Sequence, residues 1–215
     1  ICKTYVMISN GKFYESQFEE ATIELLREAH WQYAFGDDIH RKYTDPLIEE
    51  DLRNFLTVQY KDKNLTTSEM DSIVANLRNT GGQNDYYALR NAFLLYRDGY
   101  DFAYSDGRDN PFRLEYIDFE HPDHNIFRCV NQFVMEQGRE NRRPDILLFI
   151  NGIPVCIIEL KNPTKQNATI HDAHTQICTR YMRDIPALLK YCALAVISDG
   201  AKNALGTTYT PFEFF

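Results

Sequence analysis

The sequence predicts an α/β fold in which helices cover a mixed central sheet. Three observations support this fold class. An amphipathic helical pattern opens the chain, the spacing of apolar residues changes to two after Gly99, and two apolar runs meet at Asn151-Gly152. Helices and strands in this mixed order are typical of a sheet with helices on its faces.

Length and composition indicate one domain with a sizeable core, since 44% of the 215 residues are hydrophobic. No run of about 18 apolar residues occurs, so no membrane span is expected. The net charge of −8 argues against a free-standing, nonspecific nucleic-acid binder, which needs a basic face. This charge does not exclude a site that receives nucleic acid from a partner.

Cysteine usage predicts a reducing, cytoplasmic setting. The five cysteines are odd in number and form no CxxC pair, which makes structural zinc an unfavoured interpretation. The chain starts without Met and ends in Phe214-Phe215, so we expect further chain to cover that apolar end.

The first predicted helix spans residues 15–31. Ser16 is its candidate cap, with Glu19 three residues later completing a capping box. Its apolar face recurs at helical spacing in Phe18, Thr22, Leu25, Leu26 and Ala29. Residues 45–97 keep the helical pattern in three segments, which we interpret as a small helical insertion.

The remaining elements form the predicted sheet and its covering helix. The expected strands are 114–119, 126–136, 145–150, 154–161 and 194–198. A helix is expected over 168–184. Both faces of the strand at 145–150 are apolar, which is typical of a strand covered on both sides.

The two runs that meet at Asn151-Gly152 carry charges at their open end: Asp145, Glu159 and Lys161. Glu159 and Lys161 are two apart, so they share one face of their strand. A two-residue turn alone would place Asp145 opposite Ile158 and away from Glu159. A three-residue turn, or one bulge, would pair Asp145 with Glu159, with β-carbons about 5 Å apart.

Two carboxylates at that separation repel unless a cation lies between them. Oxygen ligands of this kind suit Mg²⁺, with Mn²⁺ as an alternative. Lys161 would then orient a water or steady the charge that develops on phosphorus. The competing interpretation is that these charges merely reach solvent at the ends of strands.

The segment from Arg142 to Asp199 resembles the nuclease domain of the R (restriction) subunit of type I restriction endonucleases, within the PD-(D/E)xK superfamily. The matching residues are Arg143-Pro-Asp145, Asn151-Gly-Ile-Pro154, Ile158-Glu-Leu-Lys-Asn-Pro163, Tyr181, Asp184-Ile-Pro186, Ile197-Ser-Asp-Gly200 and Gly206-Thr207. Upstream, the stretch 91–99, Asp118-Phe119 and Asn131-Gln-Phe133 continue the similarity. The resemblance implies a restriction-endonuclease-like mixed sheet flanked by helices over residues 1–215.

The resemblance also implies roles. Asp145 and Glu159 would be metal ligands and Lys161 the catalytic lysine. A first-helix glutamate would join the metal site; Glu19 matches that position best, Glu20 is the alternative, and a capping or solvent-facing role for Glu19 stays open. Arg180 and Lys165 are the candidate DNA-contacting cations.

The family further implies a catalytic glutamine four residues before a tyrosine. Here Gln176 precedes Tyr181 by five, and five residues turn a helix by about 500° rather than about 400°. Either a π-bulge realigns the two side chains, or Gln176 works beside Arg180. Ordinary surface and packing roles for Gln176 and Tyr181 are the competing interpretation.

Two histidine pairs are given no metal role. His121 and His124 have no third soft ligand evident nearby, and His171 and His174 lie one turn apart near Asp172. No G-x-x-x-x-G-K-[ST] loop occurs. ATP is therefore expected only for the full-length subunit, whose translocase would follow residue 215.

The expected function is metal-dependent hydrolysis of phosphodiester bonds in double-stranded DNA. The resemblance implies partner methylation and specificity subunits in an ATP-dependent complex, and no membrane. Two alternatives stay open: a catalytically inactive PD-(D/E)xK docking module, and another nuclease of the superfamily.

Overall fold

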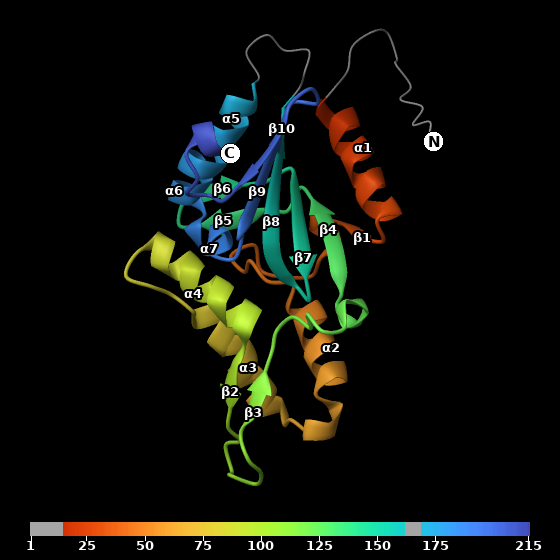
Figure 1. Ribbon diagram of the computed structural model, residues 1–215, viewed down its shortest axis with the longest axis vertical. Helices are drawn as coiled ribbons and strands as arrows, with labels where there is room; N and C mark the ends of the chain where they lie inside the picture. Colours follow the sequence, from red (N-terminus) through yellow and green to blue (C-terminus); the bar gives the residue numbers. More distant parts are fainter. Residues whose placement is uncertain (1–14, 162–168) are drawn as a thin grey trace.

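A six-stranded mixed sheet forms the centre of the protein in a computed structural model that describes residues 15–161 and 169–215 (Figure 1). Its strands, in spatial order, are β1 (Gln32–Phe35), β4 (Phe127–Asn131), β7 (Ile146–Ile150), β8 (Ile153–Leu160), β9 (Leu194–Ser198) and β10 (Asn203–Gly206). The β1–β4 and β8–β9 pairs are parallel and the other neighbours antiparallel. The predicted mixed α/β fold class is confirmed.

Helices cover both faces of this sheet (Figure 1). On one face lies α1 (Glu15–Glu28), whose Ile23 packs with Ile146 and Ile158. On the other face, Leu147 and Ile157 pack against a helical stretch that starts at Ile170. That stretch comprises α5 (Ile170–Thr175), a π-helix (Gln176–Tyr181), α6 (Met182–Asp184) and α7 (Pro186–Leu189). Burial on both faces explains why β7 shows no polar alternation.

The predicted helical segments 45–97 form three helices beside the turn of the β7–β8 hairpin. They are α2 (Glu49–Gln59), α3 (Thr67–Asn79) and α4 (Asp85–Asp98), followed by the small sheet of β2 (Tyr100–Phe102) and β3 (Phe112–Leu114). Thr66 and Glu69 form a capping box at the start of α3, and Asn84 caps α4. One hydrophobic core joins these helices to Ile153 and Tyr191.

Three boundaries differ from the sequence predictions. The helix over 15–31 ends at Glu28, because His30 adopts a positive φ of 68° and the chain enters β1, a strand that was not predicted. The predicted strand 126–136 is two strands, β4 and β5 (Met135–Gln137). The break falls at Gln132, whose φ is 55°, and β5 pairs instead with β6 (Glu140–Arg142).

The predicted strand 114–119 was also wrong. Only Leu114 lies in a strand; Tyr116 and Ile117 are buried in irregular backbone, whereas Phe119 is exposed. The Tyr116 hydroxyl donates to the carbonyl of Ile73, and the Asp118 carboxylate accepts the N–H groups of Glu120 and His121. Tertiary packing and a turn therefore replace sheet pairing here.

The proposed capping box of Ser16 and Glu19 is absent. Helix α1 already includes Glu15, so Ser16 lies inside the helix, and the Glu19 carboxylate instead accepts hydrogen bonds from the sheet. None of the described helices is long and apolar enough to cross a membrane.

Candidate active site

The hairpin geometry places Asp145 beside Glu159. The turn has only two residues, since Ile150 pairs with Ile153, but the register shifts between Leu148 and Phe149. This bulge moves Ile146 opposite Ile158, so the next pair outward is Asp145 with Glu159. Of the two alternatives, the structure has the bulge. The left-handed Asn151 (φ 50°) and Gly152 (φ 76°) form the tight turn that goes with it.

Glu159 is the most deeply buried charged residue of this cluster, with a side chain only 1% exposed. Lys161 Nζ donates to Glu159 Oε1 at 2.9 Å, while Glu159 Oε2 is buried without a hydrogen-bond partner. The Asp145 carboxylate lies on the neighbouring strand side, beside Glu159. Its Oδ2 accepts a hydrogen bond from the backbone N–H of Leu160 at 2.8 Å. A buried acceptor without a donor is costly and unusual in a folded protein.

Burial and, after it, the neighbouring Asp145 carboxylate raise the pKa of Glu159 to about 8, while Lys161 acts in the opposite direction. The ammonium of Lys161 therefore does not offset the burial of Glu159 and the charge of its acidic neighbour. A divalent cation between Asp145 and Glu159 would satisfy the orphaned oxygen and hold both carboxylates ionised. The residues present thus fit a hard metal ion.

The helical stretch that follows β8 contains a π-turn, which was one of the two alternatives that the spacing of Gln176 and Tyr181 left open. Residues Gln176–Tyr181 form a π-helix, and Gln176 Nε2 donates to the Tyr181 hydroxyl at 2.7 Å. Lys161 Nζ also donates to Gln176 Oε1 at 2.8 Å. The extra residue is thus absorbed locally, and Gln176 lies between Tyr181 and Lys161.

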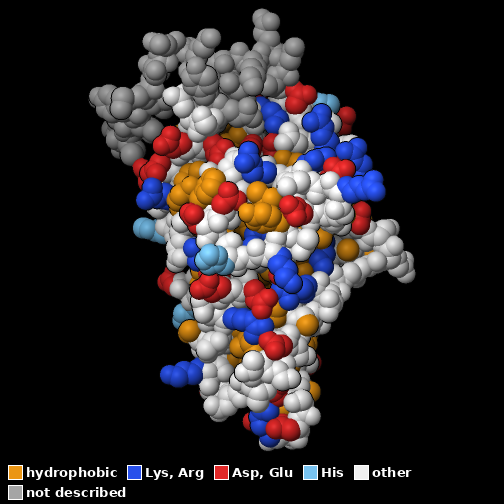
Figure 2. Space-filling model, turned by 180° about the vertical axis from the view of Figure 1, so that it is seen from behind, with side chains coloured by type: hydrophobic (Ala, Val, Ile, Leu, Met, Phe, Trp, Pro, Cys, Tyr) orange, Lys and Arg blue, Asp and Glu red, His pale blue; other side chains and the backbone are white. Residues whose placement is uncertain are grey.

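Arg180, one of the two predicted DNA-contacting cations, is not part of this cluster. Arg180 is exposed on the π-helix, and the alternative that Gln176 works beside it is not the arrangement found. Lys165 lies outside the described residues. The face shown in Figure 2 intersperses Lys and Arg with Asp and Glu, as expected for a net charge of −8.

Glu19 is held at the edge of the site by two amides. Asn131 Nδ2 donates to Glu19 Oε1 at 2.7 Å, and Gln132 Nε2 donates to both carboxylate oxygens at 3.1 and 3.0 Å. The backbone N–H of Gln132 donates to the carbonyl of Asp145 at 3.1 Å. Gln132 therefore links Glu19 to the acidic pair, whereas Glu20 is exposed.

Sequence reasoning did not assign Asn131 and Gln132 to the site. Asn131 is the last residue of β4 and Gln132 follows it; β4 pairs with β7 so that Asn131 lies opposite Ile146. The sequence does show two amide residues at the end of an apolar strand, which could have indicated a polar site there. Only the strand order, with β4 beside β7, shows that this end meets Asp145.

The fold is of the restriction-endonuclease-like α/β class, with an acidic pair and a lysine at one end of its central hairpin. The model of the family "Type I restriction enzyme R protein N terminus" matches residues 12–214. The chain therefore belongs to this family of N-terminal domains of type I restriction enzyme R proteins.

Named relatives agree with this assignment. The chain is 29% identical over 211 residues (94% of the chain, 20% of the relative) to the type I restriction enzyme HindI endonuclease subunit of Haemophilus influenzae. It is 30% identical over 205 residues (92% and 20%) to the putative MjaIXP endonuclease subunit of Methanocaldococcus jannaschii. It is 33% identical over 105 residues (47% and 31%) to the EcoprrI endonuclease subunit of Escherichia coli. The chain spans about a fifth of the length of the first two relatives.

Proposed function

We propose that this domain is a metal-dependent endonuclease of the PD-(D/E)xK type, which hydrolyses phosphodiester bonds in double-stranded DNA. The observation that supports it most directly is the buried, unpartnered Glu159 Oε2 beside Asp145. A carboxylate in that position gains more from a bound cation than from any side chain in contact with it.

Asp145 and Glu159 would hold Mg²⁺, or Mn²⁺ in its place. Glu19 would join them through a bound water or after a small movement, since its amide partners already position it. When bound, the ion would supply a Lewis acid for a phosphate oxygen and lower the pKa of a coordinated water.

Lys161 would act on the reacting atoms directly. Its ammonium is aimed by two hydrogen bonds, to Glu159 Oε1 and Gln176 Oε1, and its side chain is only 12% exposed. A cation fixed in a low-dielectric site interacts strongly with charge that develops on a phosphate. Lys161 would hydrogen-bond the attacking water or a non-bridging oxygen, and thereby orient the nucleophile in line with the leaving group.

Gln176 and Tyr181 would act as positioning residues. Tyr181 is buried and hydrogen-bonded to Gln176, which in turn accepts from Lys161. This chain fixes the lysine rotamer before DNA arrives. Preorganisation of that kind lowers the cost of reaching the transition state.

The intact subunit would work within a type I restriction complex with methylation and specificity subunits. ATP would drive a translocase elsewhere in the full-length subunit and would not bind this domain. In that arrangement the motor would hold the duplex, which agrees with the net charge of −8.

The test is plasmid cleavage by the full complex carrying Lys161→Ala. We expect cleavage to fall by about 10²–10⁴-fold while ATP hydrolysis continues. Lys61→Ala, an exposed lysine among the α2–α4 helices, is the matched control and should cleave normally. Cleavage that persists with Lys161→Ala would reject the role of the lysine.

A metal titration separates this function from an inactive docking module. Asp145→Ala should abolish Mn²⁺ binding measured by calorimetry in the full-length subunit, and it should also abolish cleavage. If the domain were a docking module, both signals would be missing in the wild-type protein, while the complex would still assemble.

A further inference from the structure

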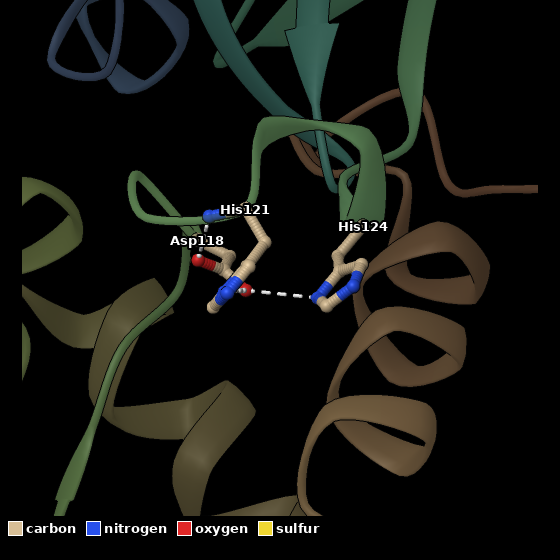
Figure 3. Close-up of side chains that lie close together, drawn as sticks. All are labelled: Asp118, His121 and His124. Carbon is tan, nitrogen blue, oxygen red and sulfur yellow. Dashed lines mark hydrogen bonds and ion pairs between the residues drawn. The ribbon is translucent and has the colours of Figure 1, made fainter.

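A second group of potential metal ligands lies at the opposite end of the central hairpin. Asp118, His121 and His124 come from the segment that leads into β4, next to α2 (Figure 3). Asn125 in the same segment bonds Asn151 in the turn of β7 and β8. This group is therefore separated from Asp145 and Glu159 by the length of the hairpin.

The turn itself fixes the carboxylate. Asp118 is only 4% exposed, and its Oδ1 accepts the backbone N–H groups of Glu120 at 3.0 Å and His121 at 2.8 Å. Gln59 of α2 donates to Oδ2 at 3.0 Å. These contacts fix the orientation of the Asp118 carboxylate. Such outer contacts are what orient a metal-binding carboxylate.

The backbone also aligns the two imidazoles. Pro122 begins a short 3-10 turn (Pro122–His124) directly after His121. The backbone N–H of His124 donates to the carbonyl of His121 at 2.9 Å, which closes the turn between them. The rings of His121 and His124 stack, with centroids 5.0 Å apart and planes 18° from parallel.

The ligand atoms converge on one point. His124 Nδ1 lies 3.1 Å from Asp118 Oδ2, and His121 Nδ1 lies 3.6 Å from the same oxygen (Figure 3). Zinc bonds of about 2.0–2.1 Å put neighbouring tetrahedral ligand atoms about 3.3 Å apart. One atom from each residue lies within 4.8 Å of the others, so a modest rotation of the exposed rings completes three corners of a tetrahedron.

The other histidine pair shows what packing alone produces. His171 and His174 are also three residues apart, but their centroids are 6.4 Å apart and their planes 40° from parallel. His174 Nε2 lies 2.9 Å from the carbonyl oxygen of Thr210, and both rings pack edge-on against Phe212. The His174 ring is partly buried and bonded in this packing, whereas the His121 and His124 side chains are 64% and 55% exposed.

We propose that Asp118, His121 and His124 bind a borderline transition-metal ion, Zn²⁺ first, with solvent in the fourth position. Two imidazoles and one carboxylate suit Zn²⁺ and Co²⁺ and do not suit Mg²⁺. The bound ion would fasten the loop before β4 to α2 through Asp118 and Gln59. This site is independent of the proposed nuclease chemistry.

The test is Zn²⁺ binding to the full-length subunit by calorimetry, with excess Mg²⁺ present to fill the acidic pair. The double variant His121→Asn/His124→Asn should bind one equivalent of Zn²⁺ fewer than wild type. The matched control His171→Asn/His174→Asn, which removes the same number of imidazoles at the same spacing, should bind as wild type. Equal stoichiometry in wild type and the His121/His124 variant would overturn the proposal.

Co²⁺ absorption provides a second measurement that does not depend on stoichiometry. Wild type should gain the visible bands of a four-coordinate Co²⁺ site, and Asp118→Asn should weaken them while circular dichroism stays unchanged. Asp145→Ala should leave the bands intact, which separates this site from the acidic pair. Bands that Asp118→Asn leaves unchanged would place the ion elsewhere.

Discussion

The two ends of the β7–β8 hairpin both bury polar side chains, but they differ in whether those side chains have hydrogen-bond partners. At the turn, Asn151 is fully buried and fully bonded: its Oδ1 accepts the N–H of Ile126, and its Nδ2 donates to Tyr116 O and Asn125 Oδ1. At the open end, Glu159 is equally buried, yet Oε2 has no partner. A satisfied buried group holds the fold together, whereas an unsatisfied one marks a place where a ligand completes the structure.

The sharpest contrast lies in the pH dependence of stability. The Glu159 carboxyl keeps its proton to about pH 8 in the folded chain, against an ordinary pKa of 4.5. The folded state then holds more protons between these values, so this group favours folding below about pH 4.5 and loses that contribution as pH rises through about 8. The loss amounts to at most about 5 kcal/mol, at about 1.4 kcal/mol per pKa unit.

Glu159→Gln should remove this slope. We expect the variant to be more stable than wild type at pH 8.5 and close to it at pH 5, in urea unfolding without metal. Added Mg²⁺ should narrow the difference, because a bound cation keeps the wild-type carboxylates ionised. If the free energy of unfolding changed with pH in the same way in both proteins, Glu159 would not have the raised pKa on which this prediction depends.

At the turn of the hairpin, where Asn151 has its hydrogen bonds satisfied, removing the buried polar group should destabilise the protein rather than stabilise it. Asn151→Ala should lower the free energy of unfolding by about 2–4 kcal/mol, because it leaves Ile126 N–H and Tyr116 C=O unpaired inside the protein. The loss should not vary with pH. Asn141→Ala, an exposed asparagine in β6, is the control and should change stability by less than about 0.5 kcal/mol.

A smaller effect is expected from the residue that aims the lysine. Gln176→Ala should reduce plasmid cleavage by the full complex about tenfold, since it removes one of two hydrogen bonds that hold Lys161. Metal binding should remain. Thr179→Ala, exposed on the same π-helix, should cleave as wild type; an equal loss in both variants would indicate a general effect on the helix.

The smallest effect belongs to the exposed cation near the site. Arg180→Gln should leave single-turnover cleavage at low salt nearly unchanged. It should reduce by about one the slope of the logarithm of the DNA-binding constant against the logarithm of the salt concentration. Arg90→Gln on α4 serves as the comparison. A slope that responds equally to both would assign Arg180 no specific contact.

Much of the site was accessible from the chain alone. Asp145, Glu159 and Lys161 stand out because charges terminate two apolar runs. The five-residue spacing of Gln176 and Tyr181 offered a π-turn as one of two alternatives. The predicted strands at 114–119 and 126–136 failed for different reasons. After Leu114, Tyr116 and Ile117 are buried by tertiary packing rather than by sheet pairing, and apolar patterning does not distinguish these cases. The strand 126–136 does enter the sheet as β4, but it breaks at Gln132, where φ is 55°.

The sequence by itself determined which residues carry charge at the end of a buried hairpin, because apolar patterning and turn chemistry are local. Tertiary structure alone decided that a bulge opposite Leu148 and Phe149 aligns Asp145 with Glu159, and that Asn131 and Gln132 hold Glu19. Strand register and strand order depend on contacts between distant segments, and no local pattern encodes them.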